Sequence, residues 1–230
     1  MQDLFNLSDS DIDFSLSFHH FDPNEIQTDE TVNCVFVVDV SPSVQSYIGD
    51  LNHAFNDFVS HMQQSHLADQ LLVSVVEFNE KVRVRSGFQP ILHLPHWQFA
   101  PSGGGTALYD ATMHGLRQAI DYRDTLLISG ISVKTLLFVI TDGEDNSSTT
   151  AAAHIKTVLQ QIEADERNAF SFTTVLFGVG SAAAFGKAQR DMGIRHLATV
   201  GTSGAEIRRM IGIISQSVAS VAGGQAPIVF

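Results

Sequence analysis

The feature that most constrains the fold is an unbroken apolar run, residues 34–38, that ends in an acid and two serines. The run is rich in β-branched and aromatic residues and lacks polar alternation, which predicts a strand buried on both faces at the centre of a parallel sheet. Asp39, Ser41 and Ser43 follow at alternating positions. One carboxylate and two hydroxyls suit a hard divalent cation. Taken alone, the same residues also suit a loop or a helix N-cap.

Strands and helices are predicted to alternate along the rest of the chain. Apolar runs predict strands at 71–78, 135–140, 172–177 and 196–200, and helical periodicity predicts helices at 47–66, 107–122, 150–168, 183–191 and 205–221. Residues 81–85 follow a two-residue turn, which predicts an antiparallel edge strand. Its Lys and Arg side chains would hinder pairing of this edge with another chain. The expected fold class is therefore α/β: a doubly wound, mostly parallel six-stranded sheet with one antiparallel edge strand and helices on both faces. Its ligand site is expected beyond the carboxyl ends of the strands.

Length and composition predict one globular domain. The chain has 230 residues, of which 44% are hydrophobic and 17% charged, and no apolar run is long enough to cross a membrane. The first residues lack the basic and apolar regions of a secretory signal. Cys34 is the single cysteine and cannot form an internal disulfide. Together these features favour a cytoplasmic protein without membrane insertion.

The acidity of the chain is concentrated at its start. The formal net charge is −12, and residues 1–30 hold eight acids and no Lys or Arg. This balance argues against nucleic acid or anionic lipid as a partner. We expect an acidic leader at 1–31, a main domain at 32–222 and a tail at 223–230. Residues 12–18 alternate between apolar and polar side chains, which favours an added strand or flap, with a disordered segment as the alternative.

Three separate loops carry the residues that point to a family. They are Asp39-x-Ser41-x-Ser43, Thr106 after three glycines, and Asp142 within Thr-Asp-Gly. With the segments Phe-Val-Val-Asp, Gly-Gly-Gly-Thr-Ala-Leu-Tyr-Asp, Phe-Val-Ile-Thr-Asp-Gly and Phe-Gly-Val-Gly, in this order, the chain resembles a von Willebrand factor A (VWA) domain. The resemblance runs from about residue 32 to residue 221 and includes all five positions of the family's metal-ion-dependent adhesion site (MIDAS).

The resemblance implies a role for each of these five residues. Ser41 and Ser43 would bind the cation directly, and Thr106 would bind it directly or through water. Asp39 and Asp142 would act mainly through water and through hydrogen bonds that orient the hydroxyls. The implied cofactor is Mg²⁺, with Mn²⁺ or Ca²⁺ as alternatives, and one coordination position stays open for a partner. The implied partner is a protein that presents an exposed Asp or Glu.

The resemblance therefore favours cation-dependent protein binding and not catalysis. Within the family, the chain looks most like the tellurite-resistance-associated branch of bacterial VWA proteins, which act in intracellular stress or signalling assemblies. The first alternative is a surface adhesin module trimmed of its signal. The second is a metal-dependent phosphate-ester hydrolase, which would require a base near a metal-bound water.

Other candidate motifs have simpler interpretations. Gly178-x-Gly180-x-x-Ala183 fits a dinucleotide fingerprint but lacks the later acidic residue, so close helix–strand packing is the better interpretation. His93 and His96 have no third metal ligand in register. Asp110 is expected to be a favourable charge at a helix start, and Glu144 and Asp145 are expected to be solvated loop residues.

Two further hypotheses concern the rim of the site. Tyr47 is a candidate rim residue at the start of a helix. Asp11 or Asp13 of the leader is a candidate to occupy the open metal position until a partner displaces it.

Overall fold

The structure is a computed structural model that describes residues 19–164, 171–181, 185–226 and 228. The predicted leader strand at 12–18 lies outside the described residues.

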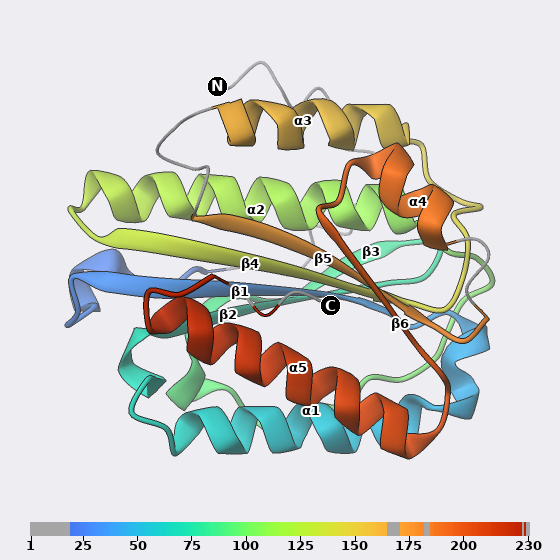
Figure 1. Cartoon of the computed structure of the whole chain (residues 1–230), viewed down its shortest axis with the longest axis horizontal. Coiled ribbons are helices and arrows are strands. Elements are labelled where there is room, and N and C mark those ends of the chain that lie inside the picture. Colours follow the sequence, from blue (N-terminus) through green and yellow to red (C-terminus); the bar gives the residue numbers. More distant parts are fainter. Residues whose placement is uncertain (1–18, 165–170, 182–184, 227, 229–230) are drawn as a thin grey trace.

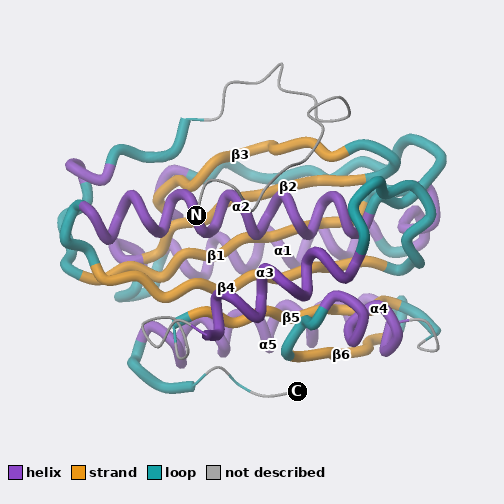
Figure 2. The backbone as a smooth tube through the Cα atoms, turned by 90° about the horizontal axis from the view of Figure 1, so that it is seen from above, coloured by secondary structure: helices purple, strands orange, loops and turns teal. Residues whose placement is uncertain are grey.

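A six-stranded sheet forms the centre of the molecule (Figure 2). Its strands are β1 (Glu30–Asp39), β2 (Leu71–Phe78), β3 (Val82–Pro90), β4 (Ser132–Thr141), β5 (Phe172–Val179) and β6 (His196–Val200). Their spatial order is β3-β2-β1-β4-β5-β6, and only β3 is antiparallel to its neighbour. The predicted fold class is confirmed, including the antiparallel strand at the edge.

Helices cover both faces of the sheet (Figure 1). One face packs against α1 (Ile48–Gln63) and α5 (Gly204–Ala222), and the other against α2 (Leu108–Ile128), α3 (Ala152–Ala164) and α4 (Phe185–Met192). No helix in the described part of the chain has the length and apolar character needed to span a bilayer.

Strand β1 lies in the middle of the sheet because both of its faces are apolar. Phe36 and Val38 belong to the core on the α1 and α5 side, while Val35 and Val37 belong to the core on the α2 and α3 side. A polar residue at every second position would place polar side chains in one of these two cores, so β1 has no such alternation. Burial also raises the pKa of the Cys34 thiol, which makes this cysteine unreactive.

Helix α2 is longer than the periodicity predicted. It continues to Ile128, six residues beyond the expected end at Tyr122. The fully buried Leu126 continues the apolar stripe for another turn beyond Tyr122. The helix ends just before Gly130, which has a positive φ of 83°.

A buried histidine on α2 predicts acid sensitivity of the fold. His114 is 7% exposed, and its Nε2 has no hydrogen-bond partner within the described residues. Burial, together with the charge of Arg117, lowers the pKa of His114 to about 4. The unfolded chain therefore takes up the proton first, so stability falls as the pH drops from about 6.5 to about 4. This histidine accounts for about 3 kcal/mol of the free energy of unfolding over that interval.

We expect His114→Gln to flatten the dependence of unfolding free energy on pH between about 6.5 and 4. Urea unfolding at several pH values measures this slope. The exposed His66 provides the matched control, since His66→Gln should keep the slope of the parent chain. An unchanged slope in His114→Gln would contradict the assignment.

Candidate metal centre

The candidate site lies where the chain leaves two neighbouring strands. β1 and β4 pair in parallel, and they end at Asp39 and Thr141 respectively. From β1 the sheet extends to β2 on one side and to β4 on the other, which is the topological switch of the fold. The loops after β1 and β4 therefore meet at one edge of the sheet.

Asp39 is held rigidly at the end of β1. Its side chain is buried, and its Oδ1 accepts a hydrogen bond from the backbone N–H of Ser41 at 2.8 Å. Its Oδ2 accepts a hydrogen bond from the hydroxyl of Thr141 at 2.6 Å. Thr141 thus orients Asp39 across the two strands. This role was missed at the sequence level, because nothing local indicates that residues 102 positions apart make contact.

The two serines connect β1 to the loop after β4. The Oγ atoms of Ser41 and Ser43 are 2.9 Å apart, and the Ser43 hydroxyl donates to Oδ1 of Asp142 at 2.6 Å. Because the Ser43 proton is used in that bond, the Ser41 hydroxyl is the donor between the two serines. Four of the five predicted residues therefore form one hydrogen-bonded row, in which the backbone N–H of Ser41 joins Asp39 and side-chain oxygens join the other three.

Thr106 lies beside this row without joining it. Its Oγ1 is 3.5 Å from the position that a Cβ on Gly143 would occupy, so it faces the loop that carries Asp142. Its backbone N–H donates to Oδ1 of Asn146 at 2.8 Å. Its hydroxyl makes no hydrogen bond to the other four residues, all of which are described. The side chain is nearly buried, and its oxygen remains available for another ligand.

The charges in the row are not balanced by protein cations. Burial is the main cause that raises the pKa of both Asp39 and Asp142, and the negative charge of Asp142 raises the pKa of Asp39 further. Neither carboxylate forms an ion pair with a described Lys or Arg. The described residues contain no group of three or more His, Cys, Asp or Glu suited to a metal ion, so hydroxyls would have to complete the donor set. This set of hard oxygen donors fits a small divalent cation.

Tyr47 is buried behind the site. Its hydroxyl makes no hydrogen bond of normal geometry, although it lies near Asp142. Burial and the charges of Asp142 and Asp39 raise the pKa of this phenol, so it remains protonated. The hypothesis of an exposed rim residue is wrong, because Tyr47 is only 1% exposed.

The loop after Asp142 is fastened to the start of α2. The Asp145 carboxylate accepts hydrogen bonds from the Ser148 hydroxyl and from the backbone N–H of Tyr109. Asp110 accepts the backbone N–H groups of Thr149 at 3.0 Å and Thr150 at 2.8 Å. Asp110 is therefore used to hold the loop. Asp145 has the same structural role, in place of the solvated one that was expected.

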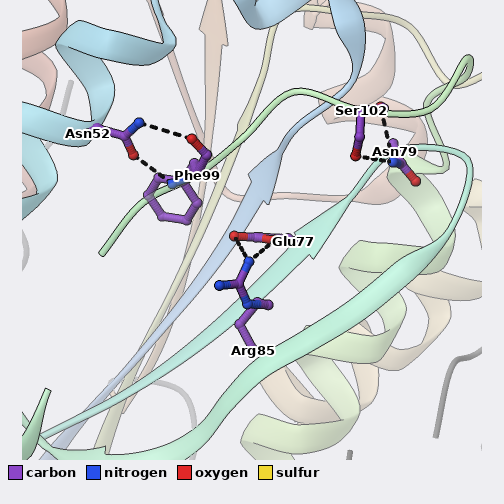
Figure 3. A network of polar contacts seen from close by, with 6 residues as sticks. All are labelled: Asn52, Glu77, Asn79, Arg85, Phe99 and Ser102. Carbon is purple, nitrogen blue, oxygen red and sulfur yellow. Dashed lines mark hydrogen bonds and ion pairs between the residues drawn. The ribbon is translucent and has the colours of Figure 1, made fainter. Parts of the chain in front are cut away.

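Asparagines fasten the segment that leads to Thr106 (Figure 3). The side-chain amide of Asn79 donates to the backbone oxygen and hydroxyl of Ser102, at 3.0 and 3.1 Å. On α1, Asn52 donates to the backbone oxygen of Phe99 and accepts from its N–H. Both asparagines were missed at the sequence level, where Asn79 was only a turn residue. Its position directly after a buried strand was the available signal.

Figure 3 also shows a nearby ion pair on the same side of the sheet. Arg85 on β3 contacts both carboxylate oxygens of Glu77 on β2, at 2.8 and 2.7 Å. The Glu77 side chain is buried, and burial raises its pKa although Arg85 acts in the opposite direction. This pair couples the edge strand β3 to its neighbour β2.

A glycine near the end of β5 has a packing role. A Cβ on Gly178 would lie 2.2 Å from a ring carbon of Phe185 on α4, so only glycine allows this helix to pack so closely. The interpretation of this motif as helix–strand packing is supported, and Ala183 lies outside the described residues.

Comparison with solved structures places the fold among VWA domains. The mussel byssus proximal thread matrix protein 1 is 17% identical, with a TM-score of 0.55 over 81% of this chain. The pilus adhesin SpaC of Lactobacillus rhamnosus GG is 13% identical, with a TM-score of 0.61 over 85%. A von Willebrand factor type A protein from Catenulispora acidiphila is 17% identical, with a TM-score of 0.56 over 84%.

These alignments cover only 45%, 31% and 43% of the other three chains, respectively. No protein-family model matches the sequence, and no curated protein matches it. The chain thus has the VWA fold, a Rossmann-like α/β architecture.

Proposed function

We propose that this chain is a protein-binding module that holds a divalent cation in a MIDAS and uses it to bind an exposed Asp or Glu of a partner. The observation that carries the proposal is the connected row from Asp39 through Ser41 and Ser43 to Asp142. Two carboxylates share this row without a protein cation, and a bound divalent cation would offset their repulsion.

Each residue has a defined part in this proposal. The hydroxyls of Ser41, Ser43 and Thr106 hold the cation, and Asp39 and Asp142 orient those hydroxyls and supply negative charge. When bound, the cation supplies an electrophilic centre that can accept a carboxylate oxygen. Mg²⁺ is the proposed cofactor, with Mn²⁺ or Ca²⁺ as alternatives. The proximal thread matrix protein also has a structure described with a zinc-occupied MIDAS, at 16% identity.

A protein partner is favoured by the surroundings of the site. A cavity of about 320 Å³ opens beside the loop after Asp142 and is lined by Gly143, Glu144, Phe185 and Lys187, among others. This cavity offers room for another side chain of the partner, next to the partner's carboxylate that would bind the cation. We propose a binding role and not catalysis, since the serine hydroxyls bond to each other and to Asp142, with no described His or Lys among their partners.

The proposal includes the cellular location of this binding. The buried single cysteine favours the reducing cytoplasm, where a bacterial stress or signalling assembly of the tellurite-resistance type would use the module. A surface adhesin is the second candidate, because SpaC, one of the structural neighbours, is a pilus adhesin. An upstream signal peptide in the genomic reading frame would favour the adhesin.

The test is selection of displayed peptides on the full chain in Mg²⁺. We expect each selected peptide to carry an Asp or Glu, and replacement of that residue by Asn or Gln should abolish binding. Chelation should release the peptides, and Asp39→Ala should weaken binding by about 10–100-fold, the usual cost of disturbing residues that orient metal ligands. The exposed Asp57 on α1 provides the control, since Asp57→Ala should bind normally. Binding that survives both chelator and Asp39→Ala would contradict the proposal.

A further inference from the structure

Tyr47 carries a buried polar group that the fold itself does not use. It is the candidate rim residue that the structure describes, whereas Asp11 and Asp13, the candidates for the open metal position, lie outside the described residues. The Tyr47 side chain is 1% exposed, and its hydroxyl forms no hydrogen bond of normal geometry with a described residue. Buried hydroxyls are nearly always hydrogen-bonded, because loss of water without a new partner costs free energy. A hydroxyl of this kind indicates a function other than stabilising the fold.

The hydroxyl of Tyr47 lies next to the candidate metal centre. The carboxylate of Asp142 is its nearest acidic neighbour in effect, followed by that of Asp39. Asp142 already accepts the hydroxyl proton of Ser43 at 2.6 Å through its Oδ1. A carboxylate can accept several hydrogen bonds, so Asp142 has room for a second donor. An unused donor and an incompletely used acceptor therefore lie side by side.

The backbone carries Tyr47 and Ser43 on one short stretch of chain. The helical turn Pro42–Ser46 contains Ser43, and Tyr47 follows it as the N-cap of α1. The backbone N–H of Tyr47 donates to the oxygen of Val44 at 3.1 Å, which closes this turn. The two side chains nearest to Asp142 therefore have a fixed spacing along one rigid segment.

A neutral donor suits this position. Burial and the charges of Asp142 and Asp39 raise the pKa of the Tyr47 phenol, so it keeps its proton. Asp142 forms no ion pair with a described Lys or Arg, and a hydrogen bond to an ionised carboxylate is stronger than one between neutral groups. Tyr47 can therefore stabilise the ionised form of Asp142 without a positive charge that would repel a cation.

We propose that Tyr47 is a positioning residue of the metal centre and donates a hydrogen bond to Asp142 when the site holds a cation. The Ser43 hydroxyl contacts this carboxylate from the loop after β1, and Tyr47 contacts it from the core. Two donors hinder rotation of the carboxylate, which keeps the Ser43 hydroxyl turned with its oxygen toward the cation. The inference rests on the proposed cation-binding function and adds a residue to it.

The proposal predicts two opposite effects of Tyr47→Phe. The substitution keeps the ring in the core and removes a buried hydroxyl that lacks a partner, so the cation-free chain should unfold at a higher urea concentration. The same substitution removes a group that orients Asp142, so the affinity for Mn²⁺ should fall at least about tenfold. A residue that only packs in the core would not combine higher stability with weaker cation binding.

Tyr122→Phe is the matched control. Tyr122 is 2% exposed, but its hydroxyl donates to the backbone oxygen of Phe21 at 2.9 Å. It belongs to α2, on the opposite face of the sheet from α1 (Figure 1). Loss of this satisfied hydrogen bond should lower the urea midpoint, and the Mn²⁺ affinity should equal that of the parent chain.

A near-ultraviolet difference spectrum detects the hydrogen bond itself. The chain has three tyrosines, and the absorption band of a phenol moves to longer wavelength when its hydroxyl donates to a carboxylate. Addition of Mg²⁺ to the full chain should produce this shift in the parent and in Tyr122→Phe. The shift should be absent in Tyr47→Phe.

The outcomes separate this inference from the function on which it rests. No Mn²⁺ binding by the parent chain would overturn the proposed function and this inference with it. Binding by the parent with equal affinity in Tyr47→Phe, or a tyrosine shift that persists in Tyr47→Phe, would overturn this inference alone. A lower urea midpoint for Tyr47→Phe without cation would also overturn it, because the hydroxyl would then have a partner in the cation-free chain.

Discussion

Asp142→Ala is expected to lower the affinity of the full chain for Mn²⁺ by about 100-fold. The substitution removes the acceptor of the Ser43 hydroxyl, so that hydroxyl is free to turn away from the neighbouring Ser41. It also removes one of the two carboxylates that attract the cation. Loss of the group that orients Ser43 and loss of negative charge both lower the affinity for the cation. This substitution therefore has the largest expected effect on function.

Titration of Mn²⁺ followed by electron paramagnetic resonance measures this loss directly, since free Mn²⁺ has a strong signal. The matched control is Glu144→Ala, which removes an exposed carboxylate two residues further along the same loop. Asp142→Asn adds a second comparison, because it keeps a hydrogen-bond acceptor for Ser43 while removing the charge. Equal Mn²⁺ affinity in Asp142→Ala and the parent chain, or an equal loss in Glu144→Ala, would show that the cation does not bind in this row.

The largest expected effect on stability is that of Phe36→Ala, at about 3–5 kcal/mol of unfolding free energy. Phe36 is fully buried at the centre of β1. Its ring centroid lies 5.1 Å from that of Phe55, 5.4 Å from that of Phe58 and 5.4 Å from that of Phe138. These rings come from α1 and β4, so a smaller residue would leave a cavity that both elements border, and neither can move freely to fill it.

Chemical denaturation of the two proteins at one pH measures the difference. Ile128→Ala is the control, because Ile128 is 87% exposed at the end of α2 and its loss should change stability by less than about 0.5 kcal/mol. A cost for Phe36→Ala as small as that of the control would mean that the core around β1 is not packed as described.

The arrangement of the sheet was largely predictable from the sequence. The buried strands β1, β2, β4 and β5 have continuous apolar runs because helices cover both of their faces, so each run was visible without knowledge of its neighbours. The basic alternation of β3 predicted an edge strand for an equally local reason. The end of α2 was misplaced, since the burial of Leu126 depends on the core beneath it and not on nearby sequence.

The composition of the candidate site was also predictable, because four of its donors lie at or just after the ends of buried strands, Thr106 precedes a helix, and all five have the chemistry of oxygen ligands. All five residues were named from motifs that resemble those of the VWA family. Their mutual contacts were not, since Ser43 and Asp142 are 99 residues apart and meet only through the parallel pairing of β1 with β4.

The sequence by itself thus determined the class of fold and the identity of the candidate ligands, because hydrophobic periodicity and side-chain chemistry are local properties. Only the tertiary structure decided which side chains support those ligands. Thr141 orients Asp39, Asp110 holds the following loop, and Asn79 holds the segment before Thr106. These roles depend on hydrogen bonds whose two groups come together only when the sheet has formed.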